Sequence, residues 1–369
     1  MPRQLFNRTL DNCRLRSWQE ADRTIRSAWR GSGQRAPQPP ANPSSFPAVF
    51  IPPCAPFPSR KPTITAPSSP QERIVFVIFG ASGNVGQSTV TALRNAGHPV
   101  RAVLRDARHR ERFAQLGCEV VIAELTDANA VAAAIDGAQA VQILCPVPVA
   151  DPDPAATMTR TIDVATAALA ANPPPVLLAL SDYGAERDGN TGITRLFHHF
   201  EEQLKTIPTH VTLLRSAEHL QNWTRILPVA LGTGVLPSFH HPVGKVFPTV
   251  WAPDVGVVAA RLLLDAPEGG NGPRIVSIEG PRRVSVTAIA DTLGAAAGRA
   301  IVAHELPRDT WAATLLRAGL SERHAQLIVD LYDVHNAGQI DVEEGVSERL
   351  YGTTTLTDAL AQLVRQHAR

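Results

Sequence analysis

An uninterrupted apolar stretch that runs directly into three regularly spaced glycines constrains the fold of this chain more than any other feature. Residues 74–79 (IVFVIF) are β-branched or aromatic, which is typical of a strand buried on both faces. Gly80, Gly83 and Gly86 follow, and a helical pattern extends from Val85 to Asn95. The glycines therefore lie at a strand-to-helix turn, which is the position of a dinucleotide-binding fingerprint.

Each glycine of this turn has its own physical role. Gly80 allows the tight turn off the strand, Gly83 leaves room for a pyrophosphate, and Gly86 lets the helix pack closely on the sheet. The N–H groups and the dipole of the new helix would then face the phosphates. The spacing is GxxGxxG rather than GxGxxG, and a glycine turn that binds no nucleotide is the alternative interpretation.

The second strand is expected at residues 100–104, and its end carries the residue that selects between coenzymes. Arg105 follows Gly86 by 19 residues, close to the usual position of the ribose contact. A carboxylate there typically holds the 2′-hydroxyl of NAD, whereas a guanidinium suits a 2′-phosphate. The sequence therefore favours NADP(H) over NAD(H). The alternative is that Arg105 is a solvated charge and Asp106 contacts the ribose.

Strands and helices continue to alternate along the chain. Further strands are expected at residues 119–123, 138–144, 176–180 and 211–215, with helices at 128–135 and 156–170. Thr126 or Asp127 is expected to cap the first of these helices. This alternation predicts an α/β fold, a Rossmann-type doubly wound parallel sheet whose ligands lie beyond the carboxyl ends of the strands.

The C-terminal part is expected to be a small, mostly helical substrate lobe interleaved with the last core strands and helices. Helices are expected at 255–264, 284–297, 308–318 and 321–334, with Asp254 as the cap of the first. Residues 228–253 suggest a loop-rich cover. We therefore divide the chain into an extension (1–72), an NAD(P)-binding core (73–215) and the lobe (216–369).

Charge and composition exclude several classes of protein. The net charge of +1 argues against an electrostatic nucleic-acid binder, and no apolar stretch is long enough to span a membrane. The four cysteines are far apart, which argues against a disulfide scaffold and suits the cytoplasm. They are Cys13, Cys54, Cys118 and Cys145.

Residues 1–72 differ from the rest in composition. They hold ten basic and four acidic residues, and 37–70 are dense in Pro and Ser, so we expect a disordered extension with a short helix around 17–29. An Arg-rich, acid-poor start is also typical of an organelle transit peptide. A translation start placed too far upstream fits equally well.

Residues 73–369 resemble the NmrA-like family of atypical short-chain dehydrogenases, including its quinone-reductase-like members. The resemblance rests on IVFVIFGASGNVG, VRAVLRD, VIAELTD, LSDYGAE, EEQLKTIPTHVTLLRSAEHLQNW and AGQIDVEEGVSERLYGTTTLTDAL. It implies an NADP(H)-binding Rossmann domain with a small lobe over the nicotinamide. It also implies the pyrophosphate contacts Gly80, Ser82, Gly83, Asn84, Val85 and Gly86, the 2′-phosphate contact Arg105, the adenine neighbours Glu124 and Leu125, and the nicotinamide-side residues Cys145 and Pro146.

The catalytic residues are not assigned by the sequence. Many short-chain dehydrogenases use a YxxxK pair, but none of the three tyrosines here has a lysine four residues later. The family often has a lysine near the position of His198, which puts a lysine-assisted mechanism in doubt. Ser181, Tyr183 and His198 remain weak candidates for orienting substrate or donating a proton, against structural roles for each.

On the substrate side, the resemblance points to His219, Asn222 and Trp223 as lining residues, with a core aromatic as the alternative for Trp223. His240-His241 lies among Pro and Gly and predicts a loop, so we expect no metal site. The leading hypothesis is an NADPH-dependent oxidoreductase that transfers hydride to a small electrophilic acceptor such as a quinone. The alternatives are a non-enzymatic NADP(H) sensor that acts through a protein partner and, on fold alone, a sugar-nucleotide epimerase.

Overall fold

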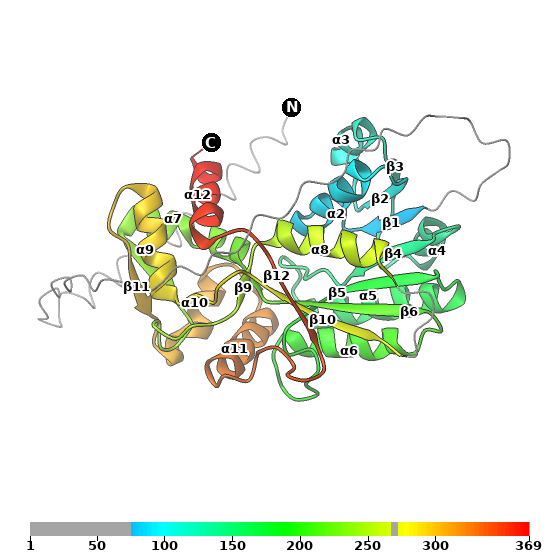
Figure 1. Ribbon diagram of the computed structural model, residues 1–369. Coiled ribbons are helices and arrows are strands. Elements are labelled where there is room, and N and C mark those ends of the chain that lie inside the picture. Colours follow the sequence, from blue (N-terminus) through cyan, green and yellow to red (C-terminus); the bar gives the residue numbers. More distant parts are fainter. Residues whose placement is uncertain (1–74, 267–271, 369) are drawn as a thin grey trace, which may run out of the picture.

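The computed structural model describes residues 75–266 and 272–368 and centres on one eight-stranded parallel sheet (Figure 1). The strand order is β12-β10-β6-β5-β4-β1-β2-β3. The strands are β1 (Phe76–Phe79), β2 (Val100–Leu104), β3 (Glu119–Ile122), β4 (Ala140–Leu144), β5 (Val176–Asp182), β6 (His210–Ser216), β10 (Arg274–Glu279) and β12 (Glu348–Tyr351). The expected extension 1–72, with its helix at 17–29, lies outside the described residues.

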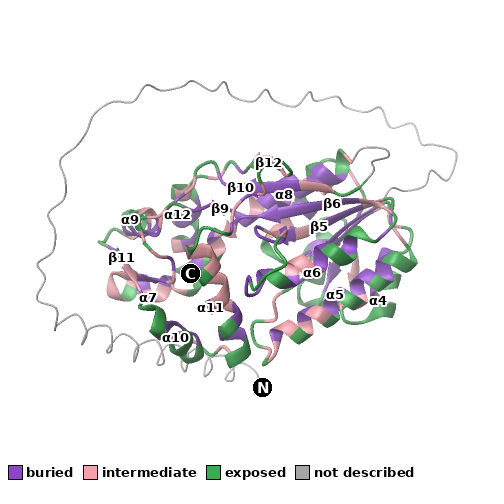
Figure 2. Ribbon diagram, turned by 90° about the horizontal axis from the view of Figure 1, so that it is seen from below, coloured by how far each residue is buried: buried purple, intermediate pink, exposed green. Residues whose placement is uncertain are grey.

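Helices cover both faces of the sheet, which explains the continuous apolar run of β1. Phe76 and Ile78 pack into one hydrophobic core, and Val77 and Phe79 pack into the other. Successive side chains of a strand point to opposite faces, so a strand between two helical layers must be apolar throughout. The strands at the centre of the sheet are buried, while the helices are exposed on their outer faces (Figure 2).

The helices of the two layers come from separate parts of the chain. On one face α2 packs closely against α8, and on the other α5 lies between α4 and α6. The bounds are α2 (Asn84–Asn95), α8 (Ala252–Leu264), α4 (Ala128–Ile135), α5 (Pro154–Ala171) and α6 (Thr194–Lys205), with α3 (Arg110–Gln115) and the short helix η1 (Ala107–His109) after β2.

The remaining elements form a smaller lobe beside the sheet (Figure 1). Its core includes Leu220, Trp223, Phe247, Ile289 and Leu360, from segments far apart in the sequence. Its helices are η2 (Leu220–Arg225), α7 (Leu227–Thr233), α9 (Val286–Ala297), η3 (Arg308–Thr310), α10 (Trp311–Arg317), α11 (Glu322–Asn336) and α12 (Leu356–His367), and its strands are β7 (Glu218–His219), β8 (Val235–Ser238), β9 (Thr249–Val250) and β11 (Val302–Glu305).

The sheet reverses its order of growth between β1 and β4. From β1 the chain adds β2 and β3 on one side and then returns to add β4, β5 and β6 on the other. In doubly wound sheets the crevice at such a switch point, beyond the carboxyl ends of the strands, is where ligands bind. The predicted doubly wound α/β fold with a largely helical C-terminal lobe is confirmed.

Two local expectations were wrong. Helix α8 begins at Ala252, so Asp254 lies inside its first turn instead of capping it. The Asp254 carboxylate accepts hydrogen bonds from the backbone N–H groups of Thr353 and Thr354, each at 2.8 Å. The segment 228–253 is also more regular than a loop, because it contains most of α7 and the strands β8 and β9.

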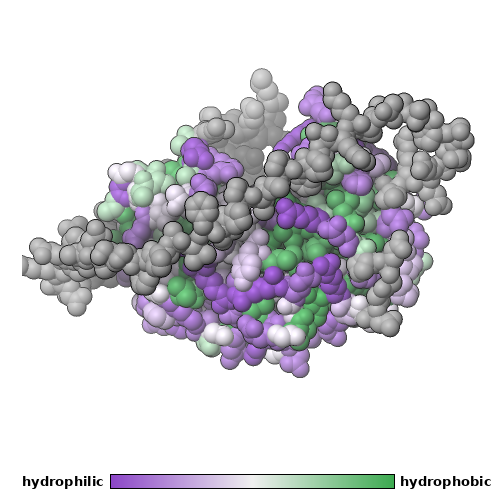
Figure 3. All heavy atoms as spheres, in the orientation of Figure 1, coloured by the Kyte–Doolittle hydropathy of each residue, from purple (hydrophilic) through white to green (hydrophobic). Residues whose placement is uncertain are grey.

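No helix in the part of the chain that the structure describes is long and apolar enough to cross a membrane. On the face shown in Figure 3, hydrophobic residues lie around the middle, near α8, with hydrophilic residues surrounding them.

Candidate functional site

The turn between β1 and α2 is built by close backbone contacts. Gly80 has a φ of +66°, in the left-handed region, and a Cβ there would lie 2.8 Å from Cδ2 of Leu144 at the end of β4. A Cβ on Gly86 would overlap the carbonyl group of Gly80. The turn therefore lies directly over the switch point, and both positions require glycine.

Helix α2 begins without a side-chain cap. Its N-cap residue, Gly83, is exposed, whereas α4 and α5 begin with the carboxylates of Asp127 and Asp153 bound to their first N–H groups. The first N–H groups of α2 are thus free of a capping side chain and could hold an anion, helped by the helix dipole. Asn84 is exposed beside them.

Ser82 and Val85 complete the turn, and both are half-buried. The Ser82 carbonyl oxygen accepts a hydrogen bond of 2.6 Å from the Gln87 side chain, which ties the turn to the first turns of the helix. The Val85 side chain packs against the core shared by α2 and α8. These two residues could therefore offer backbone groups to a pyrophosphate.

The residues after β2 separate the two predicted ribose contacts. Asp106 caps η1 through the N–H of Arg108 and binds the Arg108 guanidinium at 2.7 Å. The Arg108 hydrogen bonds hold the pKa of Asp106 well below its usual range. Arg105 is exposed and makes no side-chain hydrogen bond with any described residue. Its guanidinium could therefore turn toward a 2′-phosphate without giving up a partner.

The loops after β3 and β4 carry the other predicted cofactor neighbours. Glu124 is exposed, and Leu125 is half-buried against the sheet core. Cys145 is 4% exposed, and burial raises the pKa of its thiol to about 12. This thiol stays protonated at neutral pH, which disfavours a redox role for it. Pro146 is exposed beyond it.

Ser181 lies in a buried ionic network rather than facing a free space above the sheet. Its hydroxyl donates a 2.6 Å hydrogen bond to Oε1 of Glu201, which also binds the Arg215 guanidinium at two points, 2.8 and 2.6 Å. Glu186 and Glu343 contact the same guanidinium at 3.2 and 2.5 Å. Burial disfavours the charge of Arg215, but the Glu201 hydrogen bonds outweigh it and raise the Arg215 pKa.

Tyr183 and His198 are also occupied or enclosed. The Tyr183 side chain is 2% exposed, its hydroxyl has no hydrogen-bond partner among the described residues, and burial raises its pKa. A phenol that is harder to ionise is a poorer proton donor. Nδ1 of His198 lies 2.9 Å from the backbone oxygen of Ala185, so one of its two ring nitrogens is engaged.

The predicted substrate-side residues differ in their placement. Nε2 of His219 lies 3.1 Å from the Ser216 hydroxyl, and burial lowers the His219 pKa to about 4, against the opposing effect of Glu218. Asn222 is exposed. Trp223 is 5% exposed and belongs to the lobe core, which fits its role as a core aromatic.

The comparisons agree with this geometry. Residues 80–234 match the family described as NAD(P)H-binding. The chain is 24% identical over 281 residues, 74% of its length, to an NAD(P)H azoreductase of Xenophilus azovorans, of which it covers 93%. An NADPH-dependent quinone oxidoreductase of Escherichia coli, solved with NADPH, has a TM-score of 0.64 at 19% identity, over 79% of this chain and 100% of that one.

A structure of NmrA itself also aligns with this chain. Its TM-score is 0.56 at 17% identity, over 79% of this chain and 91% of that one. The chain is an NmrA-like NAD(P)H-binding protein. Its strand order, its glycine turn and the matched segment all place the dinucleotide end of this NmrA-like protein at β1 and α2.

One acid near the NmrA-like site was missed by the sequence analysis. Asp182 ends β5, next to the switch-point edge of the sheet, and its carboxylate accepts a 3.0 Å hydrogen bond from the Thr194 hydroxyl. Burial raises the pKa of Asp182 to about 7, with a further contribution from the Glu218 carboxylate. The sequence offered no signal for this, because an Asp at a strand end is ordinarily ionised.

A second missed group lies where the lobe meets the end of β6. Oε2 of Glu218 lies 3.1 Å from Nε2 of His240, and His335 of α11 faces the same pair. Burial lowers the His335 pKa to about 4. The three residues are distant in sequence, so no spacing motif links them.

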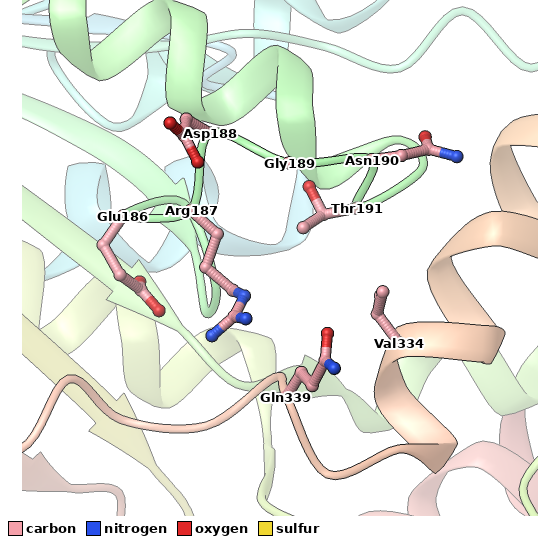
Figure 4. Close-up of a pocket in the computed structure, with 8 residues that line it drawn as sticks. All are labelled: Glu186, Arg187, Asp188, Gly189, Asn190, Thr191, Val334 and Gln339. Carbon is pink, nitrogen blue, oxygen red and sulfur yellow. The ribbon is translucent and has the colours of Figure 1, made fainter.

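A pocket of about 370 Å³ opens beside the loop that follows β5 (Figure 4). Its lining is mostly polar, unlike the apolar lining that is typical of small-molecule pockets. It contains none of the predicted substrate residues. The lining residues are Glu186, Arg187, Asp188, Gly189, Asn190, Thr191, Val334 and Gln339.

Proposed function

We propose that this NmrA-like protein is an NADPH-dependent oxidoreductase that reduces a small electrophilic acceptor such as a quinone. The observation that carries the proposal is the uncapped N-terminus of α2 at the switch point, next to the unpaired-in-structure guanidinium of Arg105. The azoreductase and quinone-reductase names of its relatives support the reaction class.

The residues of this chain would divide the coenzyme between them. Backbone N–H groups at Gly83 to Gly86 would hold the pyrophosphate, and Arg105 would bind the 2′-phosphate. The loop at Cys145 and Pro146 would border the nicotinamide. When bound, the coenzyme would supply a hydride from the nicotinamide ring to the acceptor.

A quinone acceptor makes modest demands on the protein. It takes up one hydride and one proton to give a hydroquinone, and water can supply the proton because the acceptor is already electrophilic. The protein then acts mainly by positioning the reactants and excluding solvent. We therefore propose that the chemistry proceeds without a Tyr–Lys pair.

The test is NADPH oxidation by the purified full chain with a panel of quinones and azo dyes, followed by the absorbance of reduced nicotinamide. We expect turnover with at least one quinone and slower turnover with NADH. If NADPH binds but no acceptor is reduced, the oxidoreductase proposal fails and the binding proposal remains.

A second candidate function is an NADP(H)-responsive sensor that acts through a protein partner. It is favoured by the placement of the three weak catalytic candidates: Ser181 is bound to Glu201, Tyr183 is enclosed, and His198 contacts Ala185. A sensor must couple the two coenzyme forms to partner binding with different free energies. Equal recovery of a crosslinked partner with NADP+ and with NADPH would exclude this function.

A further inference from the structure

Two imidazoles and one carboxylate converge at the junction between the sheet and the lobe. Glu218 comes from β7, His240 from the segment after β8, and His335 from the last turn of α11. One ligand-type atom from each residue lies within 4.8 Å of the other two. Because β7 follows β6 directly, this cluster lies on the side of the sheet where ligands bind in such folds.

The cluster is held in place by aromatic packing. The His240 ring stacks on Phe247 with centroids 4.0 Å apart and meets the His335 ring edge-on at 4.7 Å. His240 is 3% exposed, and the Glu218 side chain is 15% exposed. Rings fixed in this way have little rotational freedom left to lose when a ligand binds.

His335 has no partner that explains its orientation. The Glu218–His240 hydrogen bond satisfies one atom of each residue, but neither ring nitrogen of His335 makes a hydrogen bond with any described residue. An uncommitted imidazole beside a Glu–His pair supplies the third donor of a ligand set.

The donor set matches a particular class of metal. Neutral imidazole nitrogens together with one carboxylate suit Zn²⁺ and neighbouring transition metals, whereas Mg²⁺ and Ca²⁺ prefer oxygen ligands alone. Bonds of about 2.0–2.1 Å in a tetrahedral site place donor atoms roughly 3.3 Å apart. The Glu218–His240 distance of 3.1 Å already meets this, and His335 must approach by roughly 1 Å.

We propose that Glu218, His240 and His335 bind a divalent transition metal of the zinc class, with one coordination position left for water or a ligand oxygen. Three protein ligands and an open position are the arrangement of catalytic rather than structural zinc sites. The proposal does not depend on the proposed reductase activity, because metal binding can be measured without turnover.

The experiment uses the full chain after removal of metals with a chelator. Zn²⁺ is titrated by calorimetry, and Co²⁺ is added separately because its visible bands report the ligand geometry. We expect one Zn²⁺ per chain and a loss of affinity of at least about tenfold in His335→Gln and Glu218→Gln. The matched control is His304→Gln, which alters a half-buried lobe histidine of β11 and should leave the affinity unchanged.

The outcomes separate a metal site from a buried Glu–His hydrogen bond. No Zn²⁺ binding by the unmodified chain, or equal binding by His335→Gln, would overturn the proposal. Circular dichroism of each variant checks that it is folded. X-ray absorption of the zinc-loaded unmodified chain gives a test that needs no variant: two imidazoles in the first coordination shell support the site, and fewer than two overturn it.

Discussion

Gly86 lies so close to Gly80 that the carbonyl group of Gly80 occupies the space a Cβ on Gly86 would need. This contact fixes the first turn of α2 against the end of β1, and the helix axis is thereby aimed past the switch point. Gly83 lies between the two but is exposed, and a Cβ there would meet only the Gly80 carbonyl oxygen, at 3.3 Å.

These two glycines should respond differently to alanine. Gly83→Ala should leave the fold intact but weaken NADPH binding about tenfold or more, because the methyl group would enter the space of the pyrophosphate. Gly86→Ala should lower the free energy of unfolding by about 1–3 kcal/mol through overpacking. Denaturant unfolding and NADPH titration of both variants test this, and equal loss of stability in the two would contradict it.

Arg105→Gln should change coenzyme preference rather than overall binding. Loss of a charge-assisted hydrogen bond costs about 1.5–3 kcal/mol, so NADPH affinity should fall about 10- to 150-fold while NADH affinity stays the same. The matched control is Arg108→Gln, whose guanidinium is already bound to Asp106. Calorimetric titration with both coenzymes measures this; a parallel loss for NADH would remove Arg105 from the 2′-phosphate site.

Arg215→Met should be strongly destabilising, because it leaves the Glu201 carboxylate buried without a partner. Breaking a buried ion pair in this way costs about 3–5 kcal/mol. Arg274→Met breaks the more exposed Arg274–Glu348 pair and should cost about 1 kcal/mol or less. Urea unfolding provides the comparison. Adding Glu201→Gln to Arg215→Met should recover part of the lost stability, and no recovery would argue that the loss reflects packing alone.

Asp182 should make stability depend on pH. Its pKa is raised to about 7 in the folded chain, so between about pH 4 and pH 7 the folded state holds a proton that the unfolded state has released. The free energy of unfolding should therefore fall as the pH rises through this window, by up to about 1 kcal/mol per pH unit. Asp182→Asn should flatten this part of the profile.

The measurement for Asp182 is denaturant unfolding of metal-free protein from pH 4.5 to pH 8. The variant should be less stable relative to the unmodified chain at the acidic end than at the alkaline end. An unchanged difference across the range would mean that Asp182 is ionised throughout.

The local patterns of the sequence predicted most of the sheet correctly. The apolar run before Gly80 predicted β1, and Asp127 caps α4 as one of two expected residues. The start of α8 was missed because Asp254 has the composition of a cap while its carboxylate binds Thr353 and Thr354, about 100 residues later. A tertiary partner overrode a local preference, and single-sequence patterns cannot register such a partner.

The candidate site was predictable only where it depends on the backbone. A glycine turn has a sequence signature because each glycine answers a local steric demand. The Ser181–Glu201 hydrogen bond and the approach of His335 to His240 join residues from separate elements, so their roles depend on how those elements pack. The raised pKa of Asp182 likewise results from burial that the finished fold creates.

Strand β12 has a consequence for how the molecule can open. After building α11 in the lobe, the chain returns to the edge of the core sheet as β12 and then leaves again to form α12. Together with the earlier passages through β9, α8 and β10, this stitches the two parts with several covalent connections. A single-hinge clamshell motion is therefore unavailable, and the entry of a bulky molecule must rely on rearrangement of individual loops.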